Sequence, residues 1–342
     1  MHAKILGLKS AVPPHVIAQS QAAALARELF GEVRDISRMI NVFESTGIAR
    51  RYSCVPIEWY SEPHGWAERT ALYVESAVDL LEDVTHKLLD EAGLTADQLD
   101  SIVVVSTTGI ATPSLDALIV ESLGLRRDIQ RLPIFGLGCA GGVIGLSRAA
   151  AMARADPGSR VLFLAVELCA LTFSKNDTSK SNIVASALFG DGAAGAILST
   201  DGDGPAITAV REHTWPHSLD VMGWDVEDDG LRARFSKSIP ALVANHFRPL
   251  LDDFMDRHGV TLEQIDGFAC HPGGAKVLDA LEGALELPPG GLAESRAVLR
   301  EFGNMSAVTA LFVAERMWRT NRRTLLTALG PGFSCAFMLL DG

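Results

Sequence analysis

The chain has 342 residues, of which 48% are hydrophobic and 21% are charged. This composition excludes a disordered or collagen-like chain and supplies enough apolar residues for a sizeable core. At roughly 150 residues per domain, the length predicts two core-forming units or one unusually large one. The formal net charge of −12 provides no attraction for phosphate backbones, so nucleic acid is not an expected partner.

The cysteine pattern indicates reduced thiols. The odd number of cysteines and the lack of CxxC spacing predict neither a disulfide framework nor a structural metal site: Cys54, Cys139, Cys169, Cys270 and Cys335. The first residues contain only a short apolar run, interrupted by two prolines, and no stretch of 18 apolar residues follows. We therefore expect a cytoplasmic protein without stable membrane insertion.

In chain order, the first informative elements lie between residues 76 and 135. Apolar positions at helical spacing predict an amphipathic helix over Ser76–Ala92, which Gly93 ends. The segment Leu94–Asp100 leads into an apolar strand, and a further strand is predicted at Leu132–Phe135.

A glycine-rich turn follows. Cys139 stands among four glycines between the strand at 132–135 and a helix predicted over Val143–Ala155. The continuous apolar run Val161–Val166 is typical of a strand buried in a sheet that is covered on both faces.

The second half of the chain repeats this pattern. A helix predicted over Ala241–His258, ended by Gly259, precedes the segment Val260–Asp266, which aligns with the first copy without a gap. Asp266 stands 166 positions after Asp100.

Downstream, Asn304 stands 165 positions after Cys139 and is followed by a helix predicted over Val308–Arg319 and a strand over Thr324–Leu329. We interpret this as an α/β protein with two halves of like topology, residues 1–200 and 201–342. The alternative is that any two βαβ stretches align this well, because strands and helices alternate in all such folds.

The turn at Cys139 is a candidate nucleophile site. Glycines allow a sharp strand-to-helix turn, and a cysteine at a helix N-terminus feels the positive end of the macrodipole, which favours the thiolate. The alternative is a buried inert thiol, the commonest state of a free cysteine. The other four cysteines are expected to be structural.

In a duplicated fold, equivalent loops meet at the pseudo-two-fold axis, so Cys139 and Asn304 are expected in one cleft. His271 follows a predicted strand at Gly267–Cys270 and precedes a helix at Ala275–Leu285. The histidine could deprotonate a thiol, and the Asn304 amide could join it in an oxyanion hole. As alternatives, His271 is structural and Asn304 is an ordinary capping residue.

Cysteine, histidine and asparagine serve together in thiol peptidases and in the condensation of acyl thioesters. The peptidase reading fits poorly, because no CGSCW-like context surrounds Cys139. In the condensation reading, the thiolate attacks an acyl thioester. His271 and Asn304 then stabilise the enolate formed when a malonyl thioester loses carbon dioxide.

A set of short motifs in this chain resembles the type III polyketide synthases, the chalcone and stilbene synthase family. They are GCAGG at Cys139, LFGDGAA at 188–194, MGW at 222–224, HPGG at His271, GNMS at 303–306 and GPG at 330–332. The resemblance spans nearly the whole chain and implies a homodimer with a thiolase fold, a duplicated αβαβα five-layer architecture. It further implies Cys139 as nucleophile, with His271 and Asn304 decarboxylating malonyl-CoA.

The resemblance also assigns substrate-binding positions. Phe189 corresponds to an aromatic that guards the passage between the coenzyme A tunnel and the cavity, and the position of the second guard is occupied by Ala233. Thr112 replaces a larger methionine of plant members that reaches across the dimer, which could leave room for an acyl chain. The remaining positions implied to contact substrate are Thr107, Glu167, Cys169, Thr172, Ser306, Gly273 and Gly274.

Three cations are expected to meet coenzyme A phosphates. Arg50 and Arg51 align with a basic stretch of the family, and Lys276 follows the HPGG motif. The alternative is that these are solvated surface charges. Coenzyme A thioesters are expected as substrates, and no separate cofactor is expected.

The motif VELCALTF at 166–173 is most like bacterial synthases of alkylpyrones and alkylresorcinols. We therefore expect iterative condensation of malonyl-CoA onto an acyl-CoA starter of medium to long chain, followed by cyclisation. Two alternatives are a 3-ketoacyl-carrier-protein synthase III, which normally has HQAN where this chain has HPGG, and a thiolase-fold protein that binds acyl-CoA without condensing it.

Overall fold

The computed structural model describes residues 1–31, 36–228, 230–318 and 322–342. For residues 36–39 it describes the main chain only. Its main feature is a nine-stranded sheet with the strand order β11-β12-β13-β8-β1-β7-β6-β4-β5. In chain order these strands are β1 (Ala3–Ala11), β4 (Ser101–Ser106), β5 (Gln130–Phe135), β6 (Val161–Leu168), β7 (Asp191–Ser199), β8 (Ala206–Thr214), β11 (Gly267–Cys270), β12 (Arg323–Gly330) and β13 (Ser334–Asp341).

The sheet contains two copies of one strand order. In the first copy β4 is parallel to β6, and β7 joins β6 to β1 through antiparallel pairs. The second copy repeats this order as β11, β12, β13 and β8. The copies meet where Ala3 and Lys4 of β1 pair with Ile207 and Ala206 of β8. The repeat seen in the sequence is therefore a repeat of topology.

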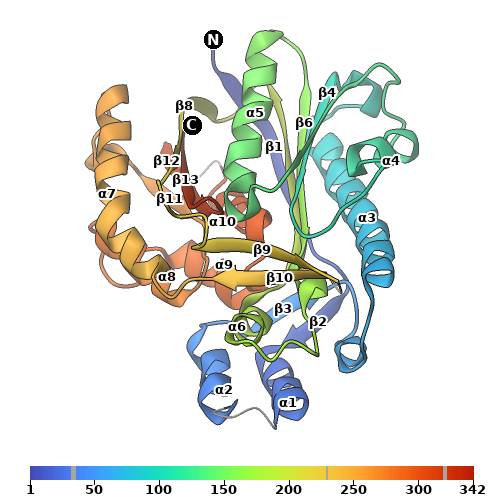
Figure 1. Cartoon of the computed structure of the whole chain (residues 1–342). Helices are drawn as coiled ribbons and strands as arrows, with labels where there is room; N and C mark the ends of the chain where they lie inside the picture. Colours follow the sequence, from blue (N-terminus) through green and yellow to red (C-terminus); the bar gives the residue numbers. More distant parts are fainter. Residues whose placement is uncertain (32–35, 229, 319–321) are drawn as a thin grey trace.

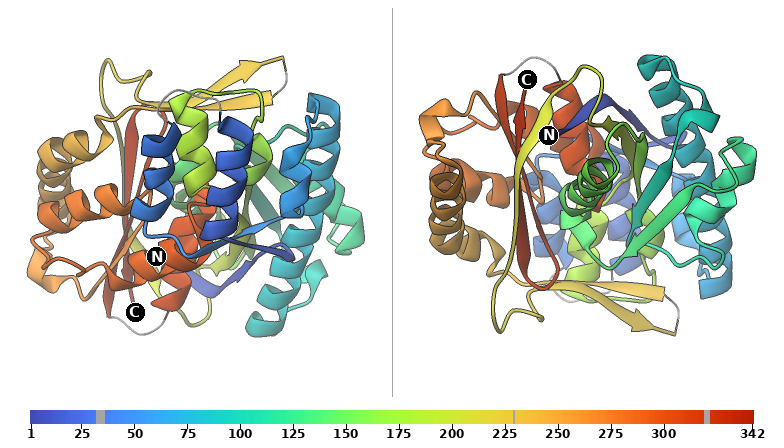
Figure 2. Two further views of the ribbon diagram at one scale, coloured as in Figure 1. Left: turned by 90° about the horizontal axis from the view of Figure 1, so that it is seen from below. Right: turned by 90° about the horizontal axis from the view of Figure 1, so that it is seen from above.

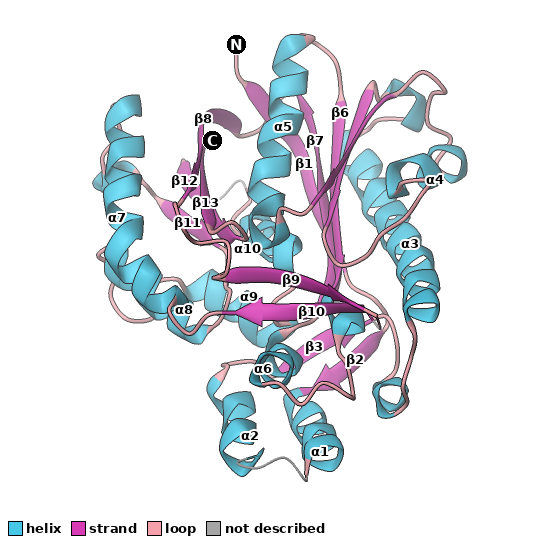
Figure 3. Cartoon of the chain, viewed as in Figure 1, coloured by secondary structure: helices cyan, strands magenta, loops and turns pink. Residues whose placement is uncertain are grey.

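Helices lie between the two half-sheets and on their outer faces (Figures 1 and 2). The central layer consists of α5 (Gly141–Ala155) and α10 (Thr309–Arg316). The outer layers are α3 (Trp66–Ala92) on the first half-sheet and α7 (Ile239–His258) with α8 (Ala275–Ala284) on the second. Figure 3 shows the resulting alternation of helices and strands, which confirms the predicted five-layer αβαβα architecture.

Strand side chains divide between these layers as the pleat requires. Val103 and Val105 face the central helices, whereas Ile102 and Val104 belong to the cluster under α3. All four are almost fully buried. A strand with both faces buried needs a continuous apolar run, which is why these segments could be recognised in the sequence.

The two copies also share an equivalent side-chain hydrogen bond. The Asp100 carboxylate accepts the N–H of Arg160 at 2.8 Å, and the Asp266 carboxylate accepts the N–H of Arg323 at 2.7 Å. In each copy the aspartate thus holds the start of the neighbouring parallel strand. The helix before each aspartate ends at a left-handed glycine, as predicted.

Some predicted boundaries were wrong. The first amphipathic helix begins at Trp66 rather than Ser76; its first buried side chain is Tyr73, so the turns before it carry no core-facing stripe. The predicted helix over Val308–Arg319 begins at Thr309, and its described part ends at Arg316. Arg319 lies outside the described residues.

Smaller elements gather toward one end of the sheets, in the middle and lower part of Figure 1. They are the strand pair β2 (His15–Ala18) and β3 (Arg50–Ser53), the hairpin β9 (Met222–Glu227) and β10 (Gly230–Phe235), and the helices α1 (Gln19–Phe30), α2 (Ile36–Ser45) and α6 (Lys180–Leu188). The remaining helices are α4 (Leu115–Ser122) and α9 (Ala293–Phe302).

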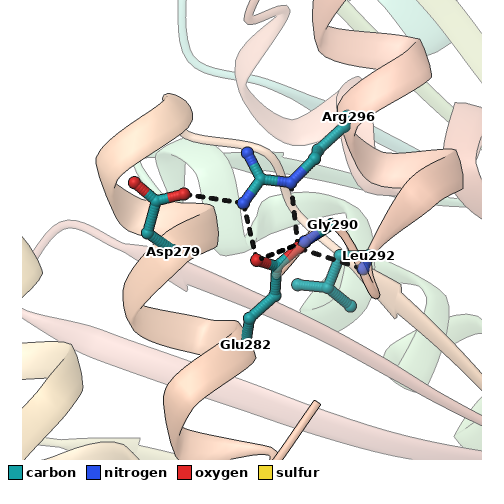
Figure 4. Close-up of polar contacts among 5 residues, drawn as sticks. All are labelled: Asp279, Glu282, Gly290, Leu292 and Arg296. Atoms are coloured by element: carbon teal, nitrogen blue, oxygen red, sulfur yellow. Dashed lines mark hydrogen bonds and ion pairs between the residues drawn. The ribbon is translucent and has the colours of Figure 1, made fainter. Parts of the chain in front are cut away.

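An ion pair between a buried carboxylate and a half-buried guanidinium ties α8 to α9 (Figure 4). The Glu282 carboxylate accepts from the Arg296 guanidinium at 2.7 and 2.9 Å, and from the main-chain N–H groups of Gly290 and Leu292. These four hydrogen bonds lower the pKa of Glu282 to about 2. They fix the start of α9, where the Ser295 hydroxyl donates to the carbonyl that ends β11 at 2.8 Å.

Candidate active site

Cys139 lies in a short 3-10 turn, residues 138–140, that leads into α5. Two glycines, one in the turn and one at the start of α5, have no space for a side chain. Gly138 has φ +49°, and a Cβ there would lie 2.5 Å from the ring of Pro331. A Cβ at Gly142 would lie 2.1 Å from the carbonyl oxygen of Ala307. The glycines therefore let the Cys139 turn pack directly against the second half of the chain.

The electrostatics of Cys139 correct one expectation. Its side chain is 7% exposed, and burial raises the pKa of the thiol to about 12, with a further increase from the Glu167 carboxylate. The neighbouring Ser306 hydroxyl opposes this shift. The helix N-terminus does not by itself make Cys139 a resting thiolate, because the cost of burying a charge is larger. A base is needed to accept the thiol proton.

His271 can supply that base. It directly follows β11, its N–H donates to the carbonyl of Thr327 at 2.8 Å, and it is 4% exposed. Burial lowers the pKa of the imidazole to about 4. Within the described residues, neither ring nitrogen has a hydrogen-bond partner. His271 is therefore a neutral imidazole with both nitrogens available to a substrate or a thiol.

Asn304 is held by its neighbours on both sides of its amide. Its Oδ1 accepts the N–H of Ser306 at 2.9 Å, and its Nδ2 donates to the carbonyl of Gly273 at 3.3 Å. Ser306 itself has φ +49°, a conformation rare for residues other than glycine. One Nδ2 hydrogen remains to stabilise a developing oxyanion.

These contacts bring the three predicted residues together from both halves of the chain. Asn304 contacts the loop that begins at His271 through Gly273, and Ser306 lies beside the Cys139 thiol. The structure thus places Cys139, His271 and Asn304 around one buried site, as the repeat predicted.

A buried carboxyl group adjoins the thiol. Glu167 is fully buried at the end of β6, and its Oε2 accepts from the Thr107 N–H at 3.0 Å and the Thr108 hydroxyl at 2.8 Å. The Ser306 side chain and the main chain of Ala307 also approach this carboxyl group and favour its charged form. Burial raises the pKa of Glu167 to about 7. The Thr107 hydroxyl accepts the N–H of Gly138, which links this group to the Cys139 turn.

A cavity lies beside this site, between α1, α6 and the 3-10 turn at 169–172. It encloses about 560 Å³, including its open mouth. Cys169, Thr172 and Phe189 line it, together with apolar side chains of α1 such as Leu25 and Ala26. Burial raises the pKa of Cys169, and Glu167, Asp191 and Cys139 add smaller contributions, so this end of the cavity lies near Cys139.

Phe189 stands where α6 ends, and its ring is covered by two aromatic side chains of the β9–β10 hairpin. The ring centroid lies 5.8 Å from that of Trp224 and 5.6 Å from that of Phe235. Ala233, the aligned position of the second guard, pairs with Trp224 across the hairpin. Sequence reasoning missed Trp224 and Phe235; the alternation of strand residues places both on the face of Ala233.

Arg51 does not have the predicted role. It is 4% exposed, and its guanidinium donates to the carbonyls of Ser186, Ala187 and Phe189 and to the Gln19 side chain. Burial lowers the pKa of Arg51 to about 10. Because its described hydrogen bonds go to protein oxygens in the interior, this cation is not presented to a coenzyme A phosphate.

Three other predicted residues lie at the surface. Arg50 and Lys276 are exposed, as a contact with coenzyme A phosphates requires. Thr112 is exposed in the loop after β4 and does not line the described cavity of its own chain. Gly274 immediately precedes α8.

The described residues contain no cluster of three or more side chains able to hold a metal ion. Among the same residues, no helix is long and apolar enough to cross a membrane.

Comparison with known proteins gives two family matches that together span nearly the whole chain. The model for the N-terminal domain of chalcone and stilbene synthases matches residues 1–202, and that for the C-terminal domain matches residues 207–341. The second match begins at β8, the first strand of the second copy.

Individual relatives agree with this. The 1,3,6,8-tetrahydroxynaphthalene synthase of Streptomyces peucetius is 37% identical over 98% of this chain and 92% of its own. An alpha-pyrone synthesis polyketide synthase-like protein of Mycobacterium tuberculosis is 29% identical over 99% of this chain and 91% of its own. The crystal structure of the tetrahydroxynaphthalene synthase from Streptomyces coelicolor superposes with a TM-score of 0.94 at 29% identity, covering 99% of both chains.

The fold is thus the thiolase fold of the type III polyketide synthases. The match favours this class over both alternatives from the sequence, the carrier-protein synthase and the non-condensing binding protein. The chain belongs to the chalcone and stilbene synthase family as a type III polyketide synthase, an acyltransferase that forms carbon–carbon bonds.

Proposed function

We propose that this polyketide synthase condenses malonyl-CoA onto an acyl-CoA starter of medium to long chain and cyclises the product to an alkylpyrone or alkylresorcinol. The observation that carries the proposal is the cavity between α1 and α6, which is lined mainly by apolar side chains such as Leu25, Ala26 and Phe173. Its apolar lining suits an alkyl chain better than a polar starter. The alpha-pyrone synthase relative supports the same product class.

The chemistry begins at Cys139. Its thiol proton passes to His271 as the sulfur attacks the starter thioester carbonyl, and the coenzyme A thiolate leaves with that proton. Because both groups are neutral at rest, proton transfer accompanies substrate binding rather than preceding it.

Extension needs an enolate. Malonyl-CoA loses carbon dioxide, and the electron pair of the broken bond becomes an enolate whose oxygen is stabilised by His271 and the free Nδ2 hydrogen of Asn304. The enolate carbon attacks the acyl-Cys139 carbonyl, and the thiolate leaves. The product is a 3-ketoacyl-CoA two carbons longer, which returns to Cys139 for the next round.

Arg50 and Lys276 are proposed to contact the coenzyme A phosphates, since both are exposed cations. Arg50 adjoins the cavity residue Arg51 along β3, and Lys276 lies in the first turn of α8, close after His271. Arginine and lysine bind phosphate through charge-assisted hydrogen bonds.

We further propose that the protein is a homodimer, formed through β5. This strand is the last one of the sheet, and its Phe135 side chain is 58% exposed. An edge strand with exposed apolar residues favours pairing with a second copy. Light scattering of the wild type and of Phe135→Glu tests this: a dimer that becomes a monomer supports the proposal, and a wild-type monomer contradicts it.

A second candidate is 1,3,6,8-tetrahydroxynaphthalene formation, favoured by the relative at 37% identity. The deciding experiment supplies acyl-CoA starters from acetyl to hexadecanoyl, each with a deuterated acyl chain, together with malonyl-CoA. Mass spectrometry should find pyrones or resorcinols that retain the label of long starters. An aromatic product without label, whatever the starter, would favour the second candidate.

A further inference from the structure

Arg51 connects the cavity to the reacting centre. Its Nη1 donates to the carbonyl of Phe189 at 3.1 Å and its Nη2 to the carbonyl of Ala187 at 3.0 Å, and both atoms also make shorter bonds, to Ser186 and Gln19. The three carbonyls belong to the C-terminal end of α6, where helix carbonyls lack partners within the helix. A cation at this end also interacts favourably with the helix dipole.

The same end of α6 is hydrogen-bonded to the condensation centre. The N–H of Asn304 donates to the carbonyl of Leu188 at 2.8 Å, and the N–H of Gly190 donates to the carbonyl of Asn304 at 3.0 Å. Phe189, between these two residues, forms the β-bridge with Asn304. The main chain that Arg51 holds is therefore the main chain that positions Asn304.

The aliphatic part of Arg51 adds a second contact to both segments. A Cβ at Gly190 would lie 3.3 Å from the Arg51 Cβ, and a Cβ at Gly303 would lie 3.5 Å from it. The arginine stem thus packs against the residues that flank the bridge on either strand. Its burial at 4% exposure agrees with this packing.

Gln19 extends the connection to α1. Its Nε2 donates to the carbonyl of Ala187 at 3.0 Å, to the carbonyl of Phe43 at 2.9 Å and to the hydroxyl of Thr46 at 3.0 Å. Gln19 is the first residue of α1, so Arg51 and Gln19 together join the two helices that line the apolar cavity.

We propose that Arg51 is a positioning residue that aligns Asn304 for condensation and holds the α1 and α6 walls of the acyl cavity together. The proposal rests on the function proposed above, because it assumes that the cavity takes the starter chain and that Asn304 stabilises the enolate. It assigns to Arg51 a task that needs a planar fork of donors, which lysine lacks.

The test separates positioning from mere folding. A pulse of radiolabelled acetyl-CoA first counts the sites at which Cys139 becomes acylated. The rate of carbon dioxide release from malonyl-CoA is then expressed per acylated site. For Arg51→Met we expect this per-site kcat to fall at least tenfold, with the acylation rate changed by less than threefold. The per-site kcat of Arg51→Lys should lie between those of Arg51→Met and the wild type.

The starter dependence gives an independent readout. Because the cavity walls loosen, the KM of Arg51→Met for hexadecanoyl-CoA should rise at least fivefold while that for acetyl-CoA changes little. Arg27→Met makes the same substitution at an exposed arginine in the last turn of α1 and is the matched control. If Arg51→Met does not fold, Gln19→Leu removes one of its partners and is measured in the same way, with the same direction of change expected.

The outcomes are distinguishable. A wild-type protein that releases no carbon dioxide from malonyl-CoA contradicts the proposed function itself. The inference is overturned if the wild type is active but the Arg51 and Gln19 variants lose only acylatable sites. Unchanged per-site kcat and starter dependence in these variants would show that Arg51 only supports folding.

Discussion

Phe189 and Asn304 are joined by a main-chain β-bridge, although 115 positions separate them in the sequence. Phe189 forms part of the cavity wall, and Asn304 presents the amide at the condensation centre. The place where the acyl chain is proposed to bind and the place where carbon–carbon bonds form are therefore parts of one hydrogen-bonded unit.

The buried carboxyl group of Glu167 should make stability depend on pH. Its pKa is raised from an ordinary 4.5 to about 7, so the folded state favours the protonated form. The resulting stabilisation is complete below about pH 4.5 and is lost as the pH rises through about 7. Between pH 5 and pH 8 the free energy of unfolding of the wild type should fall by about 2 to 3 kcal/mol more than that of Glu167→Gln. Urea unfolding of both proteins at the two pH values measures this; parallel pH dependence would contradict it.

The wall of the cavity on α1 should set the length of the starter. Ala26 is 4% exposed and lines the cavity, so Ala26→Phe places a ring where the chain is proposed to lie. We expect kcat/KM for hexadecanoyl-CoA to fall at least tenfold while the value for acetyl-CoA stays within threefold. Ala24→Phe, on the exposed side of the same helix, is the control. Equal losses for both starters would show that the chain binds elsewhere.

A large side chain at position 233 should compete with the Trp224 ring for the same volume in the β9–β10 hairpin. Trp224 and Ala233 are cross-strand neighbours, so Ala233→Phe should overfill the cluster and lower activity at least fivefold. The double variant Trp224→Ala/Ala233→Phe removes the clash and should recover most of the activity. Val226→Ala, at a position that is 74% exposed, is the control. A double variant no better than Ala233→Phe alone would mean that the two side chains do not compete.

The ion pair in Figure 4 should stabilise the second half of the chain. Glu282→Gln removes the charge that Arg296 and two N–H groups contact, and should lower the free energy of unfolding by about 2 to 3 kcal/mol at pH 7. The pKa of Glu282 is depressed to about 2, so its contribution should disappear as the pH falls below 4.5 toward 2. Asp279→Asn, at a side chain that is 64% exposed, should cost less than 1 kcal/mol and is the control. Equal effects of the two variants would contradict this.

Two α/β halves of like topology could be predicted because the buried strands are continuous apolar runs and the repeat keeps a nearly constant offset. The five-layer architecture was implied by the resemblance to the family. The predicted strands Val161–Val166 and Thr324–Leu329 both lie inside observed strands of the sheet, β6 and β12. The same repeat predicted that Cys139 and Asn304 lie close together, since pseudo-symmetric loops must meet near the axis; Ser306, which Asn304 holds, lies beside the Cys139 thiol.

Electrostatics and side-chain direction could not be predicted in the same way. The motif around Arg51 shows a cation, but only the fold shows that the guanidinium turns inward to the carbonyls of α6. The thiol of Cys139 lies at a helix start, but its pKa depends on how completely the second half buries it. Trp224 and Phe235 meet Phe189 only through the register of a hairpin far along the chain.

The central claim, that Cys139 carries the acyl chain, is tested most directly by intact-protein and peptide mass spectrometry after incubation with hexadecanoyl-CoA alone. We predict one hexadecanoyl group per chain, located on the Cys139 peptide and absent from Cys139→Ala. His271→Ala should slow its formation at least a hundredfold at pH 7, because the imidazole is proposed to accept the proton of a thiol whose pKa is about 12. Acylation of Cys169 or another thiol, or an unacylated wild type that still forms product, would contradict the account.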